Sequence, residues 1–211
     1  MTDLAEKLAG KFIVLDGPDG SGKTTQLGLL RDHLVALGAR VEAVHDPGAT
    51  AVGERIRQIL LDRDNAHMSP TCEMLLFMAS RAQLVAERVR PALADGRVVL
   101  CDRFISATIA YQGAAGVSPS AVREVAKIAV EDVQPDLTII LDLPAEAGLA
   151  RLAGSPDRME SKDLAFHRKV RELFLAHAAG GPPRFAVVDA AGEVGQIAAG
   201  IRELLEGWSF T

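Results

Sequence analysis

The most chemically informative residues of this chain lie between positions 12 and 25, in the sequence FIVLDGPDGSGKTT. Gly17, Gly22, Lys23 and Thr24 have the spacing of a phosphate-binding loop, with an apolar run before it and a helical pattern after it. In such a loop the glycines let backbone amides surround a polyphosphate, the lysine reaches its outer phosphates and the hydroxyl binds Mg²⁺. A chance match in a glycine-rich turn is the alternative, and the flanking strand and helix count against it. The segment therefore predicts a nucleoside triphosphate site.

The third predicted strand ends in a carboxylate, Asp102, and a guanidinium follows it at Arg103. Because the carboxyl ends of parallel strands meet at one edge of a sheet, Asp102 would lie beside the phosphate loop, where an acid can hold Mg²⁺ directly or through water. The alternative is an acid that caps the next helix. Arg103 is harder to explain as a structural residue, and its forked guanidinium would face the phosphates.

Two pairs of residues share helical faces at a spacing of one turn. Phe77 and Arg81 are four apart, so their ring and guanidinium could stack on a planar base and hydrogen-bond to its edge. Thr108 and Tyr111 are three apart on another helix, and Tyr111 is the one tyrosine of the chain. Taken alone, Phe77 is better explained as a core residue, and Tyr111 as a packed ring with a satisfied hydroxyl.

These residues must be positioned by elements that alternate along the chain. Apolar runs of strand length are each followed by a segment with helical period, which predicts parallel strands covered by helices on both faces. The predicted strands are residues 11–16, 41–45, 98–102, 137–143 and 184–189. A helical region over residues 52–94 is broken near 63–70, with Ser69 as its cap, and a second over 145–177 is interrupted at 153–157.

Composition narrows the class of protein. The 211 residues suit one domain, 48% of them are apolar, and the net charge is −5, so bulk electrostatics predict neither a nucleic-acid polymer nor a membrane as partner. Cys72 and Cys101 lie in apolar surroundings and are expected to be buried free thiols, and no histidine joins them at metal-ligand spacing. We expect a cytoplasmic protein without a secretory leader.

Several segments together resemble bacterial thymidylate kinase, in order and over essentially the whole chain. The phosphate loop alone is unspecific, whereas the pattern LLFxAxR followed by DRF and AYQG is quite specific. The segments are DGPDGSGKTTQ at 16–26, DPG at 46–48, LLFMASRAQ at 75–83, CDRF at 101–104, AYQG at 110–113, PDLTIILD at 135–142 and DRME at 157–160, continuing to His167.

The resemblance implies the fold and the activity. The fold is a three-layer, doubly wound α/β phosphate-loop domain over residues 1–211, with a five-stranded parallel sheet in the order 2-3-1-4-5 and a short lid at about 152–161. The activity is transfer of the γ-phosphoryl group of ATP to dTMP with Mg²⁺, giving dTDP and ADP in dTTP synthesis. A homodimer is also implied, and the helical segments 74–89 and 118–133 have apolar faces that could form it.

The resemblance also implies roles at the acceptor nucleotide. The residue matching Phe77 stacks on thymine, Arg81 hydrogen-bonds to the base edge and Gln112 helps to hold the base. Tyr111 sits near the deoxyribose, where its ring can exclude a 2′-hydroxyl, and Arg57 contacts the nucleotide. The predicted acceptor-site residues are Asp16, Asp46, Pro47, Arg57, Phe77, Arg81, Arg103, Thr108, Tyr111 and Gln112.

On the donor side, Asp19 would contact the sugar or the metal shell, and Arg151 would lie against the adenine. The predicted ATP-binding residues are Gly17, Asp19, Gly20, Ser21, Gly22, Lys23, Thr24, Thr25 and Arg151. The predicted metal ligands are Thr24 and Asp102. The predicted catalytic residues are Lys23, Arg103, Arg158 and Asp19. Since a phosphate monoester is already an anionic nucleophile, catalysis needs alignment and charge neutralisation but no general base.

The chain departs from the family pattern in its cations and acids. His45 replaces the usual arginine, Asp16 and Asp46 replace glutamates, and the segment 106–108 lacks the usual aspartate. Family members carry an arginine inside the phosphate loop or several basic residues in the lid, whereas this loop has Gly20 and the short lid has only Arg158. We expect a slower enzyme or one that relies on Arg158, in which Arg158→Ala would collapse kcat with little change in dTMP binding.

Two other hypotheses stay open at this point. A nucleoside or other nucleoside-monophosphate kinase could share these motifs, and a hydroxyl acceptor would then need a carboxylate base, for which Asp16 is the candidate. A nucleotide-binding protein without transferase activity would explain why the lid is short and has only one basic residue (the thin lid). The acceptor set around Phe77 and Tyr111 favours a monophosphate acceptor, and the retained Lys23 and Arg103 favour an active enzyme.

Overall fold

The computed structural model of this chain describes residues 4–152, 156–180 and 184–210. Its centre is a parallel five-stranded sheet in the order β2-β3-β1-β4-β5, which confirms the predicted order. The strands are β1 (Phe12–Asp16), β2 (Val41–His45), β3 (Val98–Asp102), β4 (Leu137–Asp142) and β5 (Phe185–Asp189). Three strands are one residue shorter than predicted, since Lys11, Leu143 and Arg184 lie just outside them.

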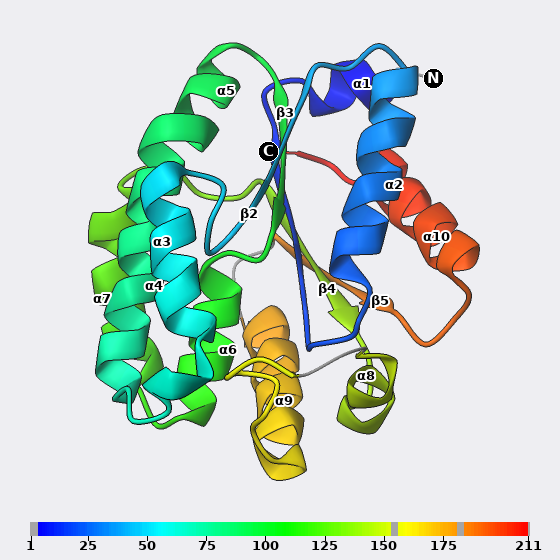
Figure 1. Cartoon of the computed structure of the whole chain (residues 1–211). Helices are drawn as coiled ribbons and strands as arrows, with labels where there is room; N and C mark the ends of the chain where they lie inside the picture. The colour runs from blue at the N-terminus through cyan, green and yellow to red at the C-terminus, as the bar shows by residue number, and fades with distance from the viewer. Residues whose placement is uncertain (1–3, 153–155, 181–183, 211) are drawn as a thin grey trace.

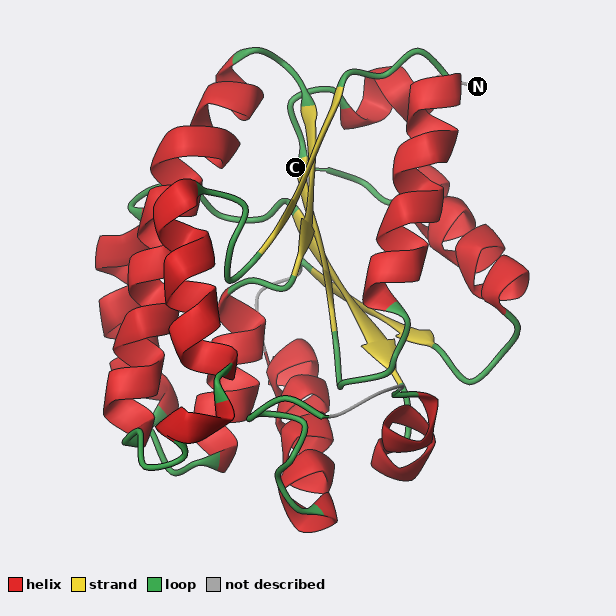
Figure 2. Ribbon diagram, in the orientation of Figure 1, coloured by secondary structure: helices red, strands yellow, loops and turns green. Residues whose placement is uncertain are grey.

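Helices cover both faces of the sheet, so the molecule has three layers (Figures 1 and 2). In Figure 1, α2 and α10 lie to the right of the sheet, and α3, α4 and α7 lie to its left. The helices are α1 (Leu4–Leu8), α2 (Lys23–Ala36), α3 (Ala51–Leu61), α4 (Pro70–Leu84), α5 (Arg90–Ala94), α6 (Ile105–Ala114), α7 (Pro119–Val130), α8 (Ala145–Arg151), α9 (Leu164–Gly180) and α10 (Val194–Gly207).

Alternate strand residues form two separate cores. Ile13 and Leu15 of β1 pack with residues of α2 and α10 on one face of the sheet. Phe12 and Val14 pack on the other face, and the Phe12 ring meets the edge of Phe104 at 5.1 Å between centroids. Because both faces of the sheet are buried, the strands are apolar throughout, as the sequence predicts for a parallel sheet.

The long helical region breaks where its sequence predicts. Helix α3 ends at Leu61, a 3₁₀ turn follows at Arg63–Asn65, and α4 begins at Pro70. Ser69 caps α4 by accepting a hydrogen bond from the backbone amide of Cys72 at 3.2 Å. The prediction for Cys72 itself is wrong, because this first turn of α4 faces solvent and leaves the free thiol exposed, while Cys101 is buried.

The register of the sheet brings the predicted functional residues to one edge. Asp102 at the end of β3 is paired with Leu15 of β1 and with His45 at the end of β2. The phosphate loop follows β1 directly, so it lies beside both strand ends. In the described parts of the chain, no helix combines the length and the apolar character needed to cross a lipid bilayer.

Candidate active site

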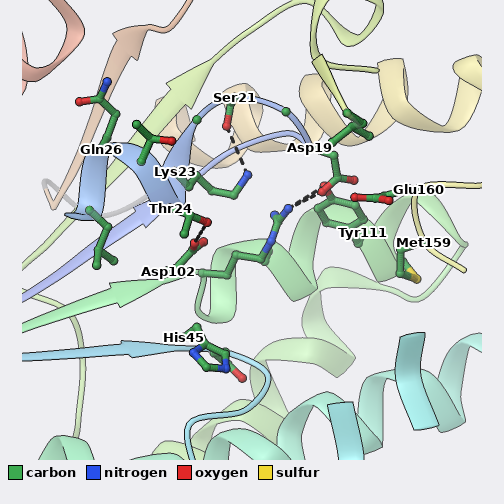
Figure 3. Close-up of a pocket in the computed structure, with 18 of the residues that line it drawn as sticks. Asp19, Ser21, Lys23, Thr24, Gln26, His45, Asp102, Tyr111, Met159 and Glu160 are labelled. Atoms are coloured by element: carbon green, nitrogen blue, oxygen red, sulfur yellow. Dashed lines mark hydrogen bonds and ion pairs between the residues drawn. The ribbon is translucent and has the colours of Figure 1, made fainter. Parts of the chain in front are cut away.

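A cleft of about 1000 Å³ opens at the carboxyl edge of the sheet (Figure 3). Almost all of the predicted donor-site and acceptor-site residues line this cleft. The lining includes Asp19, Gly20, Ser21, Gly22, Lys23, Thr24, Thr25, Asp46, Pro47, Arg57, Phe77, Arg81, Asp102, Arg103, Thr108, Tyr111, Gln112 and Arg151. The predicted residues Asp16, Gly17 and Arg158 are not among the described residues that line it.

The phosphate loop ends in the αL conformation at Gly22, from which α2 begins. The Lys23 ammonium turns back over the loop and donates to the Pro18 carbonyl at 2.7 Å and to the Ser21 hydroxyl at 3.3 Å. Burial, together with the nearby charge of Arg103, lowers the pKa of Lys23 to about 8. A bound polyphosphate would add negative charge beside this buried ammonium, to that of Asp19 and Asp102.

The loop tip packs against the backbone of α8, which explains why Gly20 carries no side chain. A Cβ at Gly20 would lie 2.1 Å from the carbonyl oxygen of Gly148, and one at Gly148 would lie 2.3 Å from that of Asp19. Gly20 also has a φ of +72°. An arginine at position 20 would therefore clash with α8 unless the loop or the helix moved.

The Thr24 hydroxyl donates a hydrogen bond of 2.6 Å to the Asp102 carboxylate, and both line the cleft (Figure 3). A hydroxyl and a carboxylate are hard oxygen ligands, and Mg²⁺ prefers few of them together with water and substrate phosphates. The predicted pair therefore fits Mg²⁺. Among the described residues, no group of three or more His, Cys, Asp or Glu side chains could hold another metal ion.

Arg103 joins the phosphate loop to the acceptor side of the cleft. Its guanidinium donates to the Gly17 carbonyl at 2.9 Å, pairs with Asp19 and donates to the Tyr111 hydroxyl at 3.3 Å. Burial raises the pKa of Asp19, but the charges of Arg103 and Lys23 outweigh this and hold that pKa below its usual value. Asp19 thus stays ionised and fixes Arg103 where the phosphates of both nucleotides would meet.

Helix α4 supplies two of the predicted acceptor residues. The Arg81 guanidinium is buried, with its Nε 2.5 Å from an oxygen of Asp46 and its Nη2 donating to the Thr108 hydroxyl at 3.0 Å. Phe77, one turn earlier, is half-buried and lines the cleft. The arrangement presents a ring and a fixed guanidinium edge to the same cavity, as stacking and edge recognition of a base require.

Besides Gly17, whose carbonyl accepts from Arg103, two predicted site residues do not line the cleft. The Asp16 carboxylate is fully buried, where one oxygen accepts from the Gly17 amide at 2.9 Å and the other from the Ser106 hydroxyl at 2.6 Å. It supports the strand-to-loop turn from behind. Arg158 is 5% exposed and lies 2.5 Å from Glu73 of α4, because that buried carboxylate needs an opposite charge. The predicted lid residues 153–155 lie outside the described residues.

The donor end of the cleft is completed by α8 and by the start of α10. Arg151 donates to the Ala190 carbonyl at 3.0 Å, and Gly192 and Val194 line the cleft beside it. The sequence predicts Arg151 at this end of the cleft but not Gly192 or Val194, because the loop after β5 carries no motif. Its signal was its position after a strand, at the same edge of the sheet as the phosphate loop.

Comparison with known proteins decides the family. The family model described as thymidylate kinase matches residues 15–201. The thymidylate kinase of Geobacter sp. strain M21 is 45% identical over 205 residues, covering 93% of this chain and 91% of its own. That of Deinococcus radiodurans is 47% identical over 184 residues, covering 86% and 89%. The chain belongs to the thymidylate kinase family.

A solved structure agrees with this assignment. The crystal structure of thymidylate kinase from Ehrlichia chaffeensis has a TM-score of 0.78 and 28% sequence identity, covering 94% of this chain and 99% of its own. As a member of the thymidylate kinase family, the chain is an ATP-dependent kinase. The departures noted above are therefore sequence differences between this chain and other members of its own family.

One departure from the thymidylate kinase pattern has a local explanation. His45 lies across the cleft from the phosphate loop in Figure 3, and its Nε2 is 2.8 Å from a carboxylate oxygen of Glu54. The same oxygen accepts from the Ala49 amide at 2.7 Å, and this bond is the main reason why the pKa of Glu54 is lowered. His45 and Glu54 together brace the turn that carries Asp46.

Proposed function

We propose that this chain transfers the γ-phosphoryl group of ATP to dTMP, giving dTDP and ADP as a step of dTTP synthesis. One observation carries the proposal. A single cleft has the phosphate loop at one end and Phe77, Arg81 and Gln112 at the other, and Arg103 bridges the two. A nucleoside triphosphate and a nucleoside monophosphate can therefore lie with their phosphates facing each other.

The reaction needs no base, because the acceptor phosphate is itself an anionic nucleophile. One of its oxygens attacks the γ-phosphorus, the bond from that phosphorus to the β,γ-bridging oxygen breaks, and ADP leaves with the electron pair. Lys23 and Arg103 neutralise charge on the transferring group, and the loop amides orient the donor. Asp157 and Met159, within the predicted lid segment, line the cleft and would help to exclude water.

Thr24 and Asp102 would hold Mg²⁺, directly or through water, in this proposal. The ion would neutralise charge on the β- and γ-phosphates when it is bound. Until then the two side chains are hydrogen-bonded to each other, with their oxygens 2.6 Å apart. That contact keeps the Asp102 carboxylate turned toward the phosphate loop.

The alternative hypotheses lose their main support. A hydroxyl acceptor would need Asp16 as base, and both of its oxygens already accept hydrogen bonds in a fully buried position. A nucleotide binder without transferase activity was favoured only by the thin lid. The close approach of Gly20 to Gly148 gives the absence of a loop arginine a structural cause, and Lys23 and Arg103 line the cleft.

We also infer a cytoplasmic homodimer. Apolar side chains are exposed on neighbouring helices, with Val52 at 49% and Ile59 at 45% on α3 and Leu75 at 49% on α4. A second copy could cover this face across a two-fold axis. The two free cysteines suit a reducing compartment. Sedimentation of the purified protein tests the dimer, and a monomer at micromolar concentration would contradict it.

ADP production with an acceptor panel tests the activity. With ATP and Mg²⁺ we expect strong turnover on dTMP, weaker turnover on dUMP, and none on thymidine or without an acceptor. Lys23→Met, prepared in parallel, controls for contaminating kinases and should lose the activity. Turnover on thymidine that exceeds turnover on dTMP would contradict the proposal in favour of a nucleoside kinase.

A further inference from the structure

Glu73 shares a helix face with the two predicted base-binding residues of α4. Glu73, Phe77 and Arg81 are spaced by four residues, so they lie one above another on α4, and the last two line the cleft. Sequence reasoning did not assign a role to Glu73, which is 4% exposed. A carboxylate is rarely buried without partners, and its partners indicate what it does.

Each oxygen of Glu73 has a different partner. Oε1 accepts from the side-chain nitrogen of Gln112 at 2.7 Å, and Oε2 lies 2.5 Å from Nη2 of Arg158. An ionised carboxylate can only accept, so the Gln112 amide must turn its NH₂ group toward Glu73. Its carbonyl oxygen therefore points away from Glu73.

That carbonyl oxygen is a buried acceptor on a residue that lines the cleft, and no described residue donates to it. The Gln112 side chain is 1% exposed and lines the cleft, and its Oε1 is buried with no hydrogen-bond partner among the described residues. A buried acceptor without a partner is costly, so a ligand that donates a hydrogen bond there is favoured. Thymine and uracil carry an N–H at position 3, whereas cytosine carries an acceptor nitrogen at the same place.

We propose that Glu73 is a positioning residue that holds the Gln112 amide with its carbonyl toward the acceptor base. This rests on the proposed function and deepens it, because it names the device by which a pyrimidine with N3–H is chosen over cytosine. Without Glu73 the amide is free to turn over and offer its NH₂ group to cytosine.

Arg158 belongs to the same device. Its Nε donates to the Leu60 carbonyl at 2.7 Å and its backbone amide to the Leu61 carbonyl at 3.2 Å, so this part of the predicted lid segment is tied to the end of α3. Arg158 compensates the charge of Glu73 from this fixed position. It acts on acceptor recognition and not on the transferring phosphoryl group, contrary to the role predicted from sequence.

Relative kcat/KM values for dTMP, dUMP and dCMP test the proposal. In Glu73→Gln the preference for dTMP over dCMP should fall by about tenfold or more, since either orientation of the amide becomes possible. The preference for dTMP over dUMP and the KM for ATP should stay unchanged, because the methyl group and the donor end are not affected. Glu124→Gln, in an exposed pair with Lys127 on α7, is the matched control.

Arg158→Met should lower the dTMP-to-dCMP preference in the same way, with no further loss in the double variant Glu73→Gln/Arg158→Met. Each single variant leaves one buried charge without its partner, whereas the double variant removes both charges. If a single variant fails to fold, the selectivity is therefore measured on the double variant. An unchanged preference in the folded variants would overturn the proposal, as would a kcat collapse in Arg158→Met with selectivity intact. If the wild-type chain does not phosphorylate dTMP, the proposed function itself fails, which is a separate result.

Discussion

The Arg81 guanidinium and the Asp46 carboxylate form an ion pair of 2.5 Å in which the two side chains are 1% and 0% exposed. The pair joins α4 to the turn after β2. It fixes the guanidinium that would read the acceptor base, so recognition and stability depend on the same contact.

Removing one partner of this pair should be strongly destabilising. We expect Asp46→Ala to lower the free energy of unfolding by about 3–5 kcal/mol, because it leaves the Arg81 charge buried and uncompensated. Urea denaturation measures the change. Glu146→Ala breaks the exposed pair with Arg168 and should leave the unfolding midpoint nearly unchanged. Equal midpoint shifts in the two variants would contradict this account.

Gly148 allows a second test, because alanine is normally the better helix former. A Cβ at Gly148 would meet the Asp19 carbonyl at 2.3 Å, whereas no described atom lies within 4 Å of one at Gly200 in α10. Gly200→Ala should stabilise the protein by about 0.5–1 kcal/mol. Gly148→Ala should instead destabilise it and weaken ATP binding, because the loop tip must move.

Calorimetric titration of both variants with ATP measures the affinities, and thermal unfolding measures the stabilities. An ATP affinity of Gly148→Ala equal to that of wild type would show that the loop tolerates displacement from α8. The structural explanation for Gly20 would then be wrong.

The pKa of Lys23 predicts proton uptake on ATP binding. Burial lowers that pKa to about 8, so near pH 8 about half of the free protein carries a neutral amine. The triphosphate stabilises the ammonium and raises its pKa, so binding takes up protons at pH 8, takes up none at pH 6, and weakens as the pH rises above 8.

Titration calorimetry in two buffers with different ionisation enthalpies counts the protons. Lys23→Arg, which keeps its charge throughout, should abolish the uptake at pH 8. Uptake that persists in this variant would assign the titration to another group.

The activity should depend on the planar, forked guanidinium of Arg103 and not only on its positive charge. It contacts the Gly17 carbonyl, Asp19 and the Tyr111 hydroxyl at once, which a lysine cannot do. We expect Arg103→Lys to lower kcat by about 10²-fold or more, with smaller changes in KM. Arg97→Lys, at a partly exposed arginine before β3, is the control, and equal kcat values for the two variants would contradict the assignment.

The chemistry of the donor end could be predicted from the sequence because it depends on local spacing. The phosphate loop and Arg103 follow strands directly and Asp102 ends one, so their place in the chain determines their place in the fold. The strand order came from the family resemblance. Periodicity alone predicts a parallel sheet but not which strands are neighbours.

The residues whose surroundings the sequence did not predict depend on contacts between distant segments. Arg158 looks like a lid cation in the sequence, and only the fold brings it to Glu73, which is 85 positions earlier in the numbering. Gly148 carries no motif, since its role arises where α8 meets the loop tip. Glu73 did have a signal, an acidic residue at helical spacing from Phe77 and Arg81, but burial was needed to distinguish it from a solvent-exposed charge.

The most direct test of the central claim follows the phosphoryl group itself. Wild-type protein is incubated with Mg²⁺, ATP labelled at the γ-phosphate, and dTMP, and the nucleotides are then separated. We expect the label to appear in dTDP in equal amount to the ADP formed, and to be absent when Lys23→Met replaces the wild type. Label found only as inorganic phosphate, or in a product of thymidine but not of dTMP, would contradict the assignment of this cleft to dTMP phosphorylation.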